Sequence, residues 1–108
     1  MIINKSKQYL KDYKKNIINK HLLKEQIRIN NIENLIISVS NMKMLLTNPY
    51  KNIYHIEQKS GKLKEYYTAR INDKLRLIMK PIGNYPYDVL NIEGIEFINI
   101  DNKHYGEG

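Results

Sequence analysis

The sequence 63-LKEYYTARINDKLRLIM-79 alternates apolar and polar residues with a period of two, which is the pattern of β-strands. Residues 66–71 and 75–80 are therefore predicted to be strands. The intervening Asn72-Asp73-Lys74 has the composition of a turn. These features together predict an antiparallel β-hairpin in the second half of the chain.

The length of this turn determines which side chains share a face of the sheet. A two-residue turn would place Ala69 opposite Arg76 and mix charge into the apolar face. A three-residue turn places Ala69 opposite Leu77, and we predict this turn because strand register follows the hydrophobic pattern. One face then carries Tyr67, Ala69, Ile71, Leu75, Leu77 and Met79, and the other carries Tyr66, Thr68, Arg70, Arg76, Ile78 and Lys80. Two arginines are thus expected on one exposed face.

Upstream of the hairpin the pattern is helical, and neither Gly nor Pro occurs before Pro49. Apolar residues recur mostly at three- and four-residue intervals over residues 7–19 and again over residues 22–47, which predicts two helices. Ser6 is a candidate N-cap for the first helix. Asn48 precedes a proline, which disfavours helical backbone and ends the second helix.

Downstream of the hairpin the sequence predicts a turn over residues 81–86, a short strand over 88–92 and a further strand over 95–100. The expected fold class is α+β. Two N-terminal helices, within about 7–47, pack on one face of a three- to four-stranded antiparallel sheet, within about 64–103. The 108 residues suit a single domain, 1–108.

The charge of the chain is strongly positive and unevenly distributed. Residues 1–80 carry 17 Lys or Arg against six Asp or Glu, whereas residues 81–108 carry one against five. Such a surface attracts polyanions, of which phosphate backbones are the most common in a cell, or acidic proteins. The alternative is a lysine-rich composition inherited from an AT-rich genome, which the abundant Ile, Asn and Lys would also fit.

The composition also limits the cell compartment and the kind of site. The absence of cysteine excludes disulfides and zinc–thiolate sites. The N-terminal MIINKSKQYL lacks the apolar core of a secretory signal, and no segment approaches the ~18 apolar residues of a membrane span. We therefore expect a cytoplasmic protein without a membrane partner. No His/Asp/Glu spacing suggests a metal site, and no phosphate-cradling glycine loop suggests a nucleotide cofactor, so no cofactor is expected.

Several short motifs resemble those of the RelE/ParE superfamily, the toxins of type II toxin–antitoxin systems, in particular HigB- and YoeB-like members. They are Arg70-Ile71-Asn72 followed after three residues by Arg76-Leu77-Ile78, the stretch Tyr54-His-Ile-Glu57 ahead of Lys62-Leu63, and the ending Lys103-His104-Tyr105. The resemblance covers roughly residues 4–106. Two features depart from the family: only Ile2 and Ile3 remain of its opening strand, and three residues follow Tyr105.

The resemblance implies a RelE-like, microbial-ribonuclease-type fold and a ribosome-dependent mRNA endonuclease that a cognate antitoxin neutralises. The ribosome, mRNA and antitoxin are thus the expected partners. The planar fork of Arg76 suits bidentate phosphate contact, and Arg70 would be a second phosphate contact. His104, whose ordinary pKa is ~6.5, could transfer a proton, and Tyr105 could donate a proton, orient the phosphate or stack on a base.

By resemblance, Glu57 would be the base that accepts the proton of the RNA 2′-hydroxyl. Four basic residues are expected to hold the RNA backbone: Lys59, Lys62, Lys64 and Lys74. The plain alternatives are a surface ion pair of Arg76 with Glu65 or Glu96, a surface carboxylate at Glu57 and a solvated run of lysines. At the level of function, the alternatives are a ParE-like gyrase poison and a non-catalytic basic nucleic-acid-binding module.

Overall fold

The hairpin forms with the predicted register in the computed structural model, which describes residues 1–102. Its strands are β3 (Tyr67–Arg70) and β4 (Leu75–Pro81). Ala69 lies opposite Leu77, and the amide of Ile71 donates to the Leu75 carbonyl at 3.0 Å. In the turn, the side-chain oxygen of Asn72 accepts from two successive backbone amides, at 2.8 Å each. An asparagine at this position stabilises the turn because its side chain replaces a backbone acceptor.

The hairpin belongs to a five-stranded sheet of order β1-β5-β4-β3-β2. The other strands are β1 (Ile2–Lys5), β2 (Glu57–Gln58) and β5 (Gly94–Asn102). The α+β class is confirmed, but the sheet has five strands rather than three or four, and β1 runs parallel to β5. The opening strand, expected to be barely present, does form. Its four residues pair one by one with residues 94–97 of β5, and this pairing compensates for the short apolar signal.

The two predicted helices are present with altered limits. The first consists of α1 (Lys7–Tyr13) and a π-helical turn η1 (Lys14–Ile18). Ser6 is its N-cap, as predicted: its Oγ accepts from the Tyr9 amide at 3.0 Å. The second, predicted as one helix over 22–47, divides into α2 (Leu23–Ser38) and α3 (Met42–Leu46). A short helix, α4 (Tyr50–Ile53), follows Pro49.

The break between α2 and α3 also explains why the strand predicted over residues 88–92 does not form. Val39 is extended, and Asn41 begins α3 by accepting from the Met44 amide at 2.9 Å. The first amides of α3 donate to the carbonyls of Val89 and Ile92, at 3.0 and 2.9 Å. The strand predicted over residues 88–92 is therefore wrong. This segment forms turns, and its carbonyls satisfy the open N-terminus of α3.

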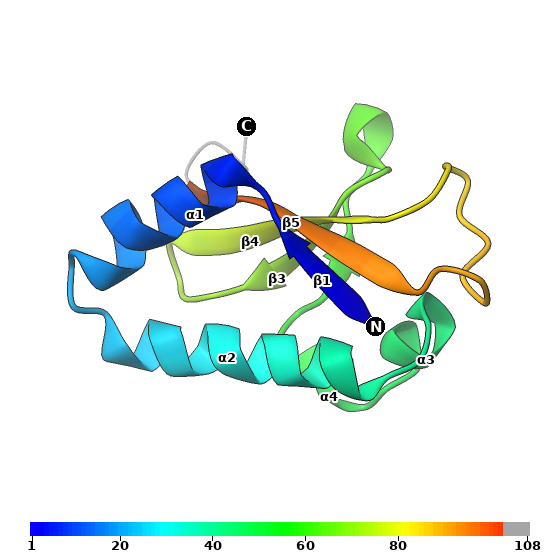
Figure 1. Cartoon of the computed structure of the whole chain (residues 1–108), viewed down its shortest axis with the longest axis horizontal. Helices are drawn as coiled ribbons and strands as arrows, with labels where there is room; N and C mark the ends of the chain where they lie inside the picture. The colour runs from blue at the N-terminus through cyan, green and yellow to red at the C-terminus, as the bar shows by residue number, and fades with distance from the viewer. Residues whose placement is uncertain (103–108) are drawn as a thin grey trace.

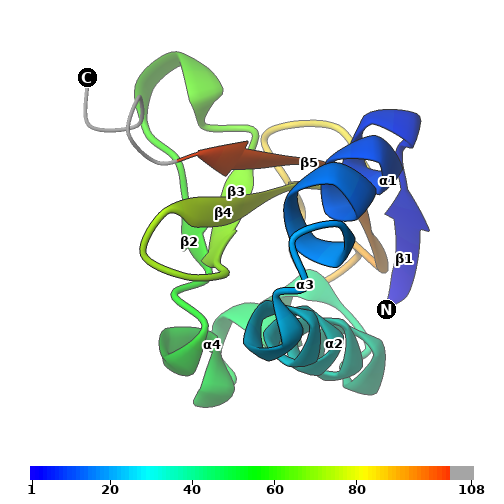
Figure 2. The ribbon, with the colours of Figure 1, turned by 90° about the vertical axis from the view of Figure 1, so that its left-hand side faces the viewer.

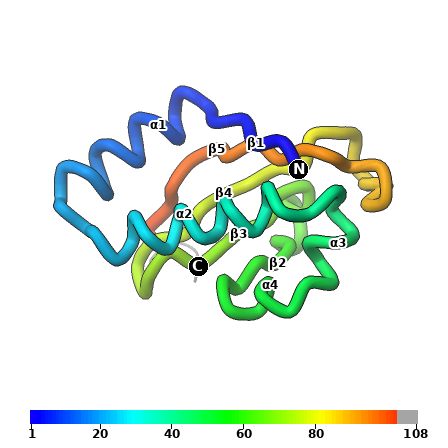
Figure 3. The backbone as a smooth tube through the Cα atoms, turned by 60° about the horizontal axis from the view of Figure 1, so that its bottom comes forward, coloured from blue at the N-terminus to red at the C-terminus, as the bar shows by residue number. Residues whose placement is uncertain are grey.

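Helices α1 and α2 cover one face of the sheet and leave the other face open (Figures 1 and 2). The core between them consists of side chains that are fully or almost fully buried, among them Tyr9, Ile29, Ile32, Ile36, Ala69, Leu77, Met79 and Phe97. After α3 the chain turns back through α4 and β2 to the outer edge of β3 (Figure 3). None of the helices within residues 1–102 is both long enough and apolar enough to span a membrane.

Candidate active site

The two arginines of the hairpin lie side by side on the open face of the sheet. Arg70 is directly opposite Arg76 across the β3–β4 pair, and Arg76 is directly opposite Asp101 across the β4–β5 pair. Residues paired in this way project to the same face with Cβ atoms ~5 Å apart. Both arginines are half-buried, and their neighbours Ala69 and Leu77 face the helices. The predicted pair of cations on the open face is therefore present.

Glu57 lies on the same face, one row further along the sheet, where a row is a set of directly opposite residues on neighbouring strands. It is directly opposite Thr68 in the β2–β3 pair, and Thr68 precedes Arg70 by two residues. Diagonal neighbours of this kind are separated by ~7–8 Å, so a phosphate group could lie between the carboxylate of Glu57 and the guanidinium of Arg70. The side chain of Glu57 is exposed, and no hydrogen bond or ion pair within residues 1–102 engages it.

The hairpin turn itself orients the two guanidinium groups. Arg76 donates from Nη1 to the carbonyls of Asn72 and Leu75, at 2.7 and 3.1 Å. Arg70 forms an ion pair with Asp73 in the turn. The side chain of Asp73 is 87 % exposed, and ion pairs this accessible to water contribute only ~0–1 kcal/mol. A phosphate group could therefore replace Asp73 at little cost. Glu65, one of the two ion-pair partners considered for Arg76, forms an ion pair with Lys80 at 3.6 Å.

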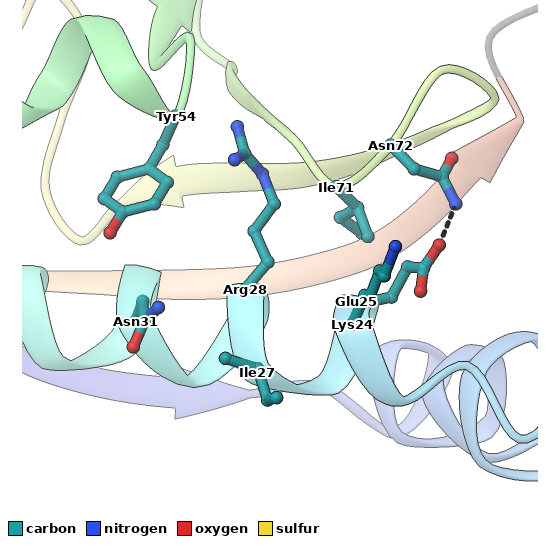
Figure 4. A pocket seen from close by; sticks show the side chains of 8 residues that line it. All are labelled: Lys24, Glu25, Ile27, Arg28, Asn31, Tyr54, Ile71 and Asn72. Atoms are coloured by element: carbon teal, nitrogen blue, oxygen red, sulfur yellow. Dashed lines mark hydrogen bonds between the residues drawn. The ribbon is translucent and has the colours of Figure 1, made fainter.

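Helix α2 holds the end of the hairpin through side chains that Figure 4 shows, among them Arg28 and Glu25. Arg28 donates from Nε to the Arg70 carbonyl at 2.6 Å and from Nη2 to the Ile53 carbonyl at 2.9 Å. Its guanidinium carbon is 5.1 Å from the centroid of the Tyr54 ring. The amide of Arg70 donates in turn to the Tyr54 carbonyl at 2.8 Å. One side chain thus fixes the backbone of Arg70 and the segment that leads to Glu57.

A second contact of α2 reaches the turn: Asn72 donates from Nδ2 to Glu25 at 2.9 Å (Figure 4). Since Asn72 also accepts from the guanidinium of Arg76, Glu25 and Arg28 together restrain both arginines. The sequence analysis did not identify these two residues. One signal was available: Arg28 is the single arginine among residues 1–49.

A pocket of about 220 Å³ opens on the same face of the sheet, next to the row formed by Arg70, Arg76 and Asp101. Its apolar lining comes from Leu63, Tyr66, Ile78 and Ile98, and its polar groups come from Lys59, Asn99 and Asp101. The neighbouring backbone is anchored by Tyr87, whose hydroxyl donates to the Glu65 carbonyl at 2.7 Å. Burial, and next the carboxylate of Glu65, raise the pKa of Tyr87 to about 12, so this donor keeps its proton at neutral pH.

The four lysines expected to bind RNA occupy three different environments. Lys59 lines the pocket described above. Lys62 lies in the exposed 3₁₀ turn Gly61–Leu63, and Lys74 is exposed at the tip of the hairpin. The ammonium of Lys64 instead lies 5.4 Å from the centroid of the Tyr85 ring. Of these four lysines, the structure therefore brings only Lys59 to the pocket on the open face.

Two of the predicted site residues, His104 and Tyr105, lie outside the described residues. Within residues 1–102, no group of three or more His, Cys, Asp or Glu side chains is arranged to hold a metal ion.

Comparison with known proteins places this architecture among bacterial toxins. No protein-family model matches the sequence, and no curated protein is detectably similar to it. Among solved structures, the Escherichia coli DinJ–YafQ toxin–antitoxin complex contains a chain that aligns over 98 % of this chain and 96 % of its own length, at 22 % identity and TM-score 0.62. A YafQ mutant from E. coli aligns over 98 % and 97 %, at 22 % identity and TM-score 0.61. The YoeB/ParE toxin from Agrobacterium tumefaciens aligns over 94 % and 98 %, at 15 % identity and TM-score 0.61. The chain thus has the fold of RelE/YoeB-like toxins, as its motifs predicted.

Proposed function

We propose that this chain, which has the fold of RelE/YoeB-like toxins, is the toxin of a type II toxin–antitoxin pair and cleaves mRNA on the ribosome. One observation carries the proposal: Arg70 and Arg76 are paired on the open sheet face, with Glu57 one row away on that face. Two cations and a carboxylate on one face supply two of the three functions that cleavage of RNA through its own 2′-hydroxyl needs: charge stabilisation and a general base. A general acid is the third.

In this reaction the 2′-oxygen attacks the adjacent phosphorus, the O2′–P bond forms and the P–O5′ bond breaks. Negative charge builds up on the non-bridging phosphoryl oxygens, and Arg76 and Arg70 stabilise it. Their guanidinium groups suit this task because they stay charged and donate two parallel hydrogen bonds to a phosphate. Removing one such preorganised donor typically lowers the rate ~10²–10³-fold.

Two proton transfers accompany the change in bonding. Glu57 takes the proton of the attacking 2′-hydroxyl, and an acid returns one to the departing 5′-oxygen. We assign the acid to His104 or Tyr105. These residues follow Asn102 by two and three positions in the sequence. Asn102 ends β5 opposite Leu75, the neighbour of Arg76.

The charge of the chain supports the proposed partners. Residues 1–80 carry a net charge of +11, which favours contact with ribosomal RNA and with a message in the cytoplasm. It also favours an antitoxin that presents acidic and apolar groups, because complementary charge accelerates association and suppresses wrong orientations. The similarity to a chain of the DinJ–YafQ complex agrees with an antitoxin partner. Lys59, Lys62, Lys64 and Lys74 would hold the RNA backbone.

The test is inducible expression in bacteria, followed by mapping of mRNA ends on ribosomes. The wild-type chain should arrest growth and cut translated messages, whereas Arg76→Ala should do neither at matched expression. Lys11→Ala, which removes an exposed cation from α1, should remain fully toxic. Full toxicity of Arg76→Ala would refute the assigned site. Growth arrest with DNA damage and intact messages would indicate a gyrase poison, and the absence of arrest would indicate a binding module.

A further inference from the structure

The pocket on the open face exists because β5 contains a bulge. The pairing of β4 with β5 runs from Ile78 opposite Asn99 directly to Met79 opposite Phe97, so Ile98 is an extra residue without a partner. Successive residues of a regular strand point to opposite faces. Here Ile98 and Asn99 both line the pocket, which the bulge makes possible. Bulges commonly re-aim side chains in this way next to active sites.

The segment before α1 and α1 itself hold this bulge in place. Ser6 donates from Oγ to the Ile98 carbonyl at 2.6 Å, and the Ile100 amide donates to Asp12 at 2.9 Å. On the other side of the pocket, Gln58 donates from Nε2 to the Lys64 carbonyl at 2.7 Å. The Lys59 amide donates to the Tyr66 carbonyl at 2.9 Å. Both walls of the pocket are therefore fixed by hydrogen bonds.

The lining of the pocket is partly apolar and partly polar. Ile78 is only 6 % exposed although it belongs to the face without helices, and the Tyr66 ring lies beside it with Lys80 5.7 Å from the ring centroid. No hydrogen bond or ion pair within residues 1–102 engages the side chains of Lys59, Asn99 and Asp101. A flat apolar ligand with polar edges would match both parts.

We propose that this pocket is a nucleobase subsite that takes an unpaired guanine of the RNA next to the cleaved phosphate. The inference rests on the proposed function, since it names the base that the same face reads. Proteins recognise single-stranded RNA by stacking bases on aromatic and apolar side chains and by hydrogen bonds to base edges. At about 220 Å³ the pocket is smaller than the ~300–1,000 Å³ of drug-sized sites, as expected for one flat ring system.

The polar groups of the pocket favour guanine over the other bases. Guanine alone presents two adjacent N–H donors on its Watson–Crick edge, and the two oxygens of the Asp101 carboxylate can accept both. Its O6 can accept from the ammonium of Lys59 or the amide of Asn99, whereas uracil offers only one N–H donor. The position also fits, because Asp101 is directly opposite Arg76, which we assign to the phosphate.

The test uses ribosome-bound messages that differ only in the base on either side of the cleaved bond, cut under single-turnover conditions. Wild-type protein should cleave the guanine message faster than the uracil message by roughly 10- to 100-fold, the discrimination expected of one bidentate contact. Asp101→Asn should reduce this ratio to within about threefold of unity. Using the ratio cancels the effect of the lost charge on general RNA affinity. Glu93→Gln, an equal charge change next to the opposite end of β5, should leave the ratio unchanged.

A second measurement does not depend on cleavage. Guanosine 5′-monophosphate, titrated into the whole chain, should shift the methyl NMR signals of Ile78 and Ile98 through the ring current of the base. Uridine 5′-monophosphate should shift them much less, and Asp101→Asn should remove the difference. Equal shifts with both nucleotides, or an unchanged guanine preference in Asp101→Asn, would overturn the subsite. If no message is cleaved but the guanine-specific shifts occur, the proposed function fails and the subsite stands.

Discussion

Replacing Arg28 by alanine should loosen the hairpin that carries both arginines. The substitution removes the hydrogen bonds to the carbonyls of Arg70 and Ile53 and the contact with the Tyr54 ring. A charged donor to a part-buried carbonyl contributes about 1.5–2 kcal/mol, and we discount the exposed bond to Ile53 to ~0.5. A partly exposed cation–π contact adds ~0.5 kcal/mol. The free energy of unfolding should therefore decrease by about 3 kcal/mol.

Denaturant unfolding measures this loss directly. Lys24→Ala is the matched control, because it removes an exposed cation one turn earlier in α2 and should change stability by ~0.5 kcal/mol or less. Arg28→Lys keeps the charge but cannot donate to two carbonyls in a fixed fork, so it should lose most of the stabilisation. An Arg28→Ala variant within 0.5 kcal/mol of wild type would refute the view that α2 restrains the hairpin through this side chain.

Three further predictions follow from other parts of the molecule. Tyr9→Phe should raise the free energy of unfolding by about 1 kcal/mol, because the Tyr9 hydroxyl is buried without a partner among the described residues; a loss of stability would contradict this. Burial raises the pKa values of Tyr9, Tyr67 and Tyr87 above 10.0. Unfolded chains therefore lose these protons at lower pH than folded chains, and the free energy of unfolding should fall as pH rises above 10. A free energy of unfolding that stays constant up to pH 11.5 would contradict this. Deleting residues 104–108 should abolish RNA cleavage while co-sedimentation with ribosomes persists, and loss of both would make the tail a docking element.

Local sequence was sufficient to predict the hairpin and the placement of its arginines. The alternation over residues 66–80 allows only one register that keeps charge out of the core, and the structure has that register. Ser6 was likewise predictable as an N-cap, because a serine before an apolar helical pattern has few other roles there. These features depend on neighbours a few residues apart.

Features that depend on distant partners could not be predicted. The break after Ser38 is fixed by the carbonyls of Val89 and Ile92, some 50 residues further along the chain. Strand β1 exists because β5 is available to pair with it. The restraint of the hairpin by Glu25 and Arg28 joins residues more than 40 positions apart. Apart from Arg28 being the single arginine among residues 1–49, nothing in the local sequence marks such contacts.

The attack of the RNA 2′-hydroxyl beside Arg70 and Arg76 is the central claim, and a single substitution in the RNA tests it most directly. The purified wild-type chain is mixed in single-turnover conditions with two ribosome-bound messages, one all-ribose and one with 2′-deoxyribose 5′ of the cleaved bond. The account predicts that the first is cut to leave a 2′,3′-cyclic phosphate or 3′-phosphate end and that the second stays intact. Cleavage of the deoxy message at the same bond and a similar rate would contradict it.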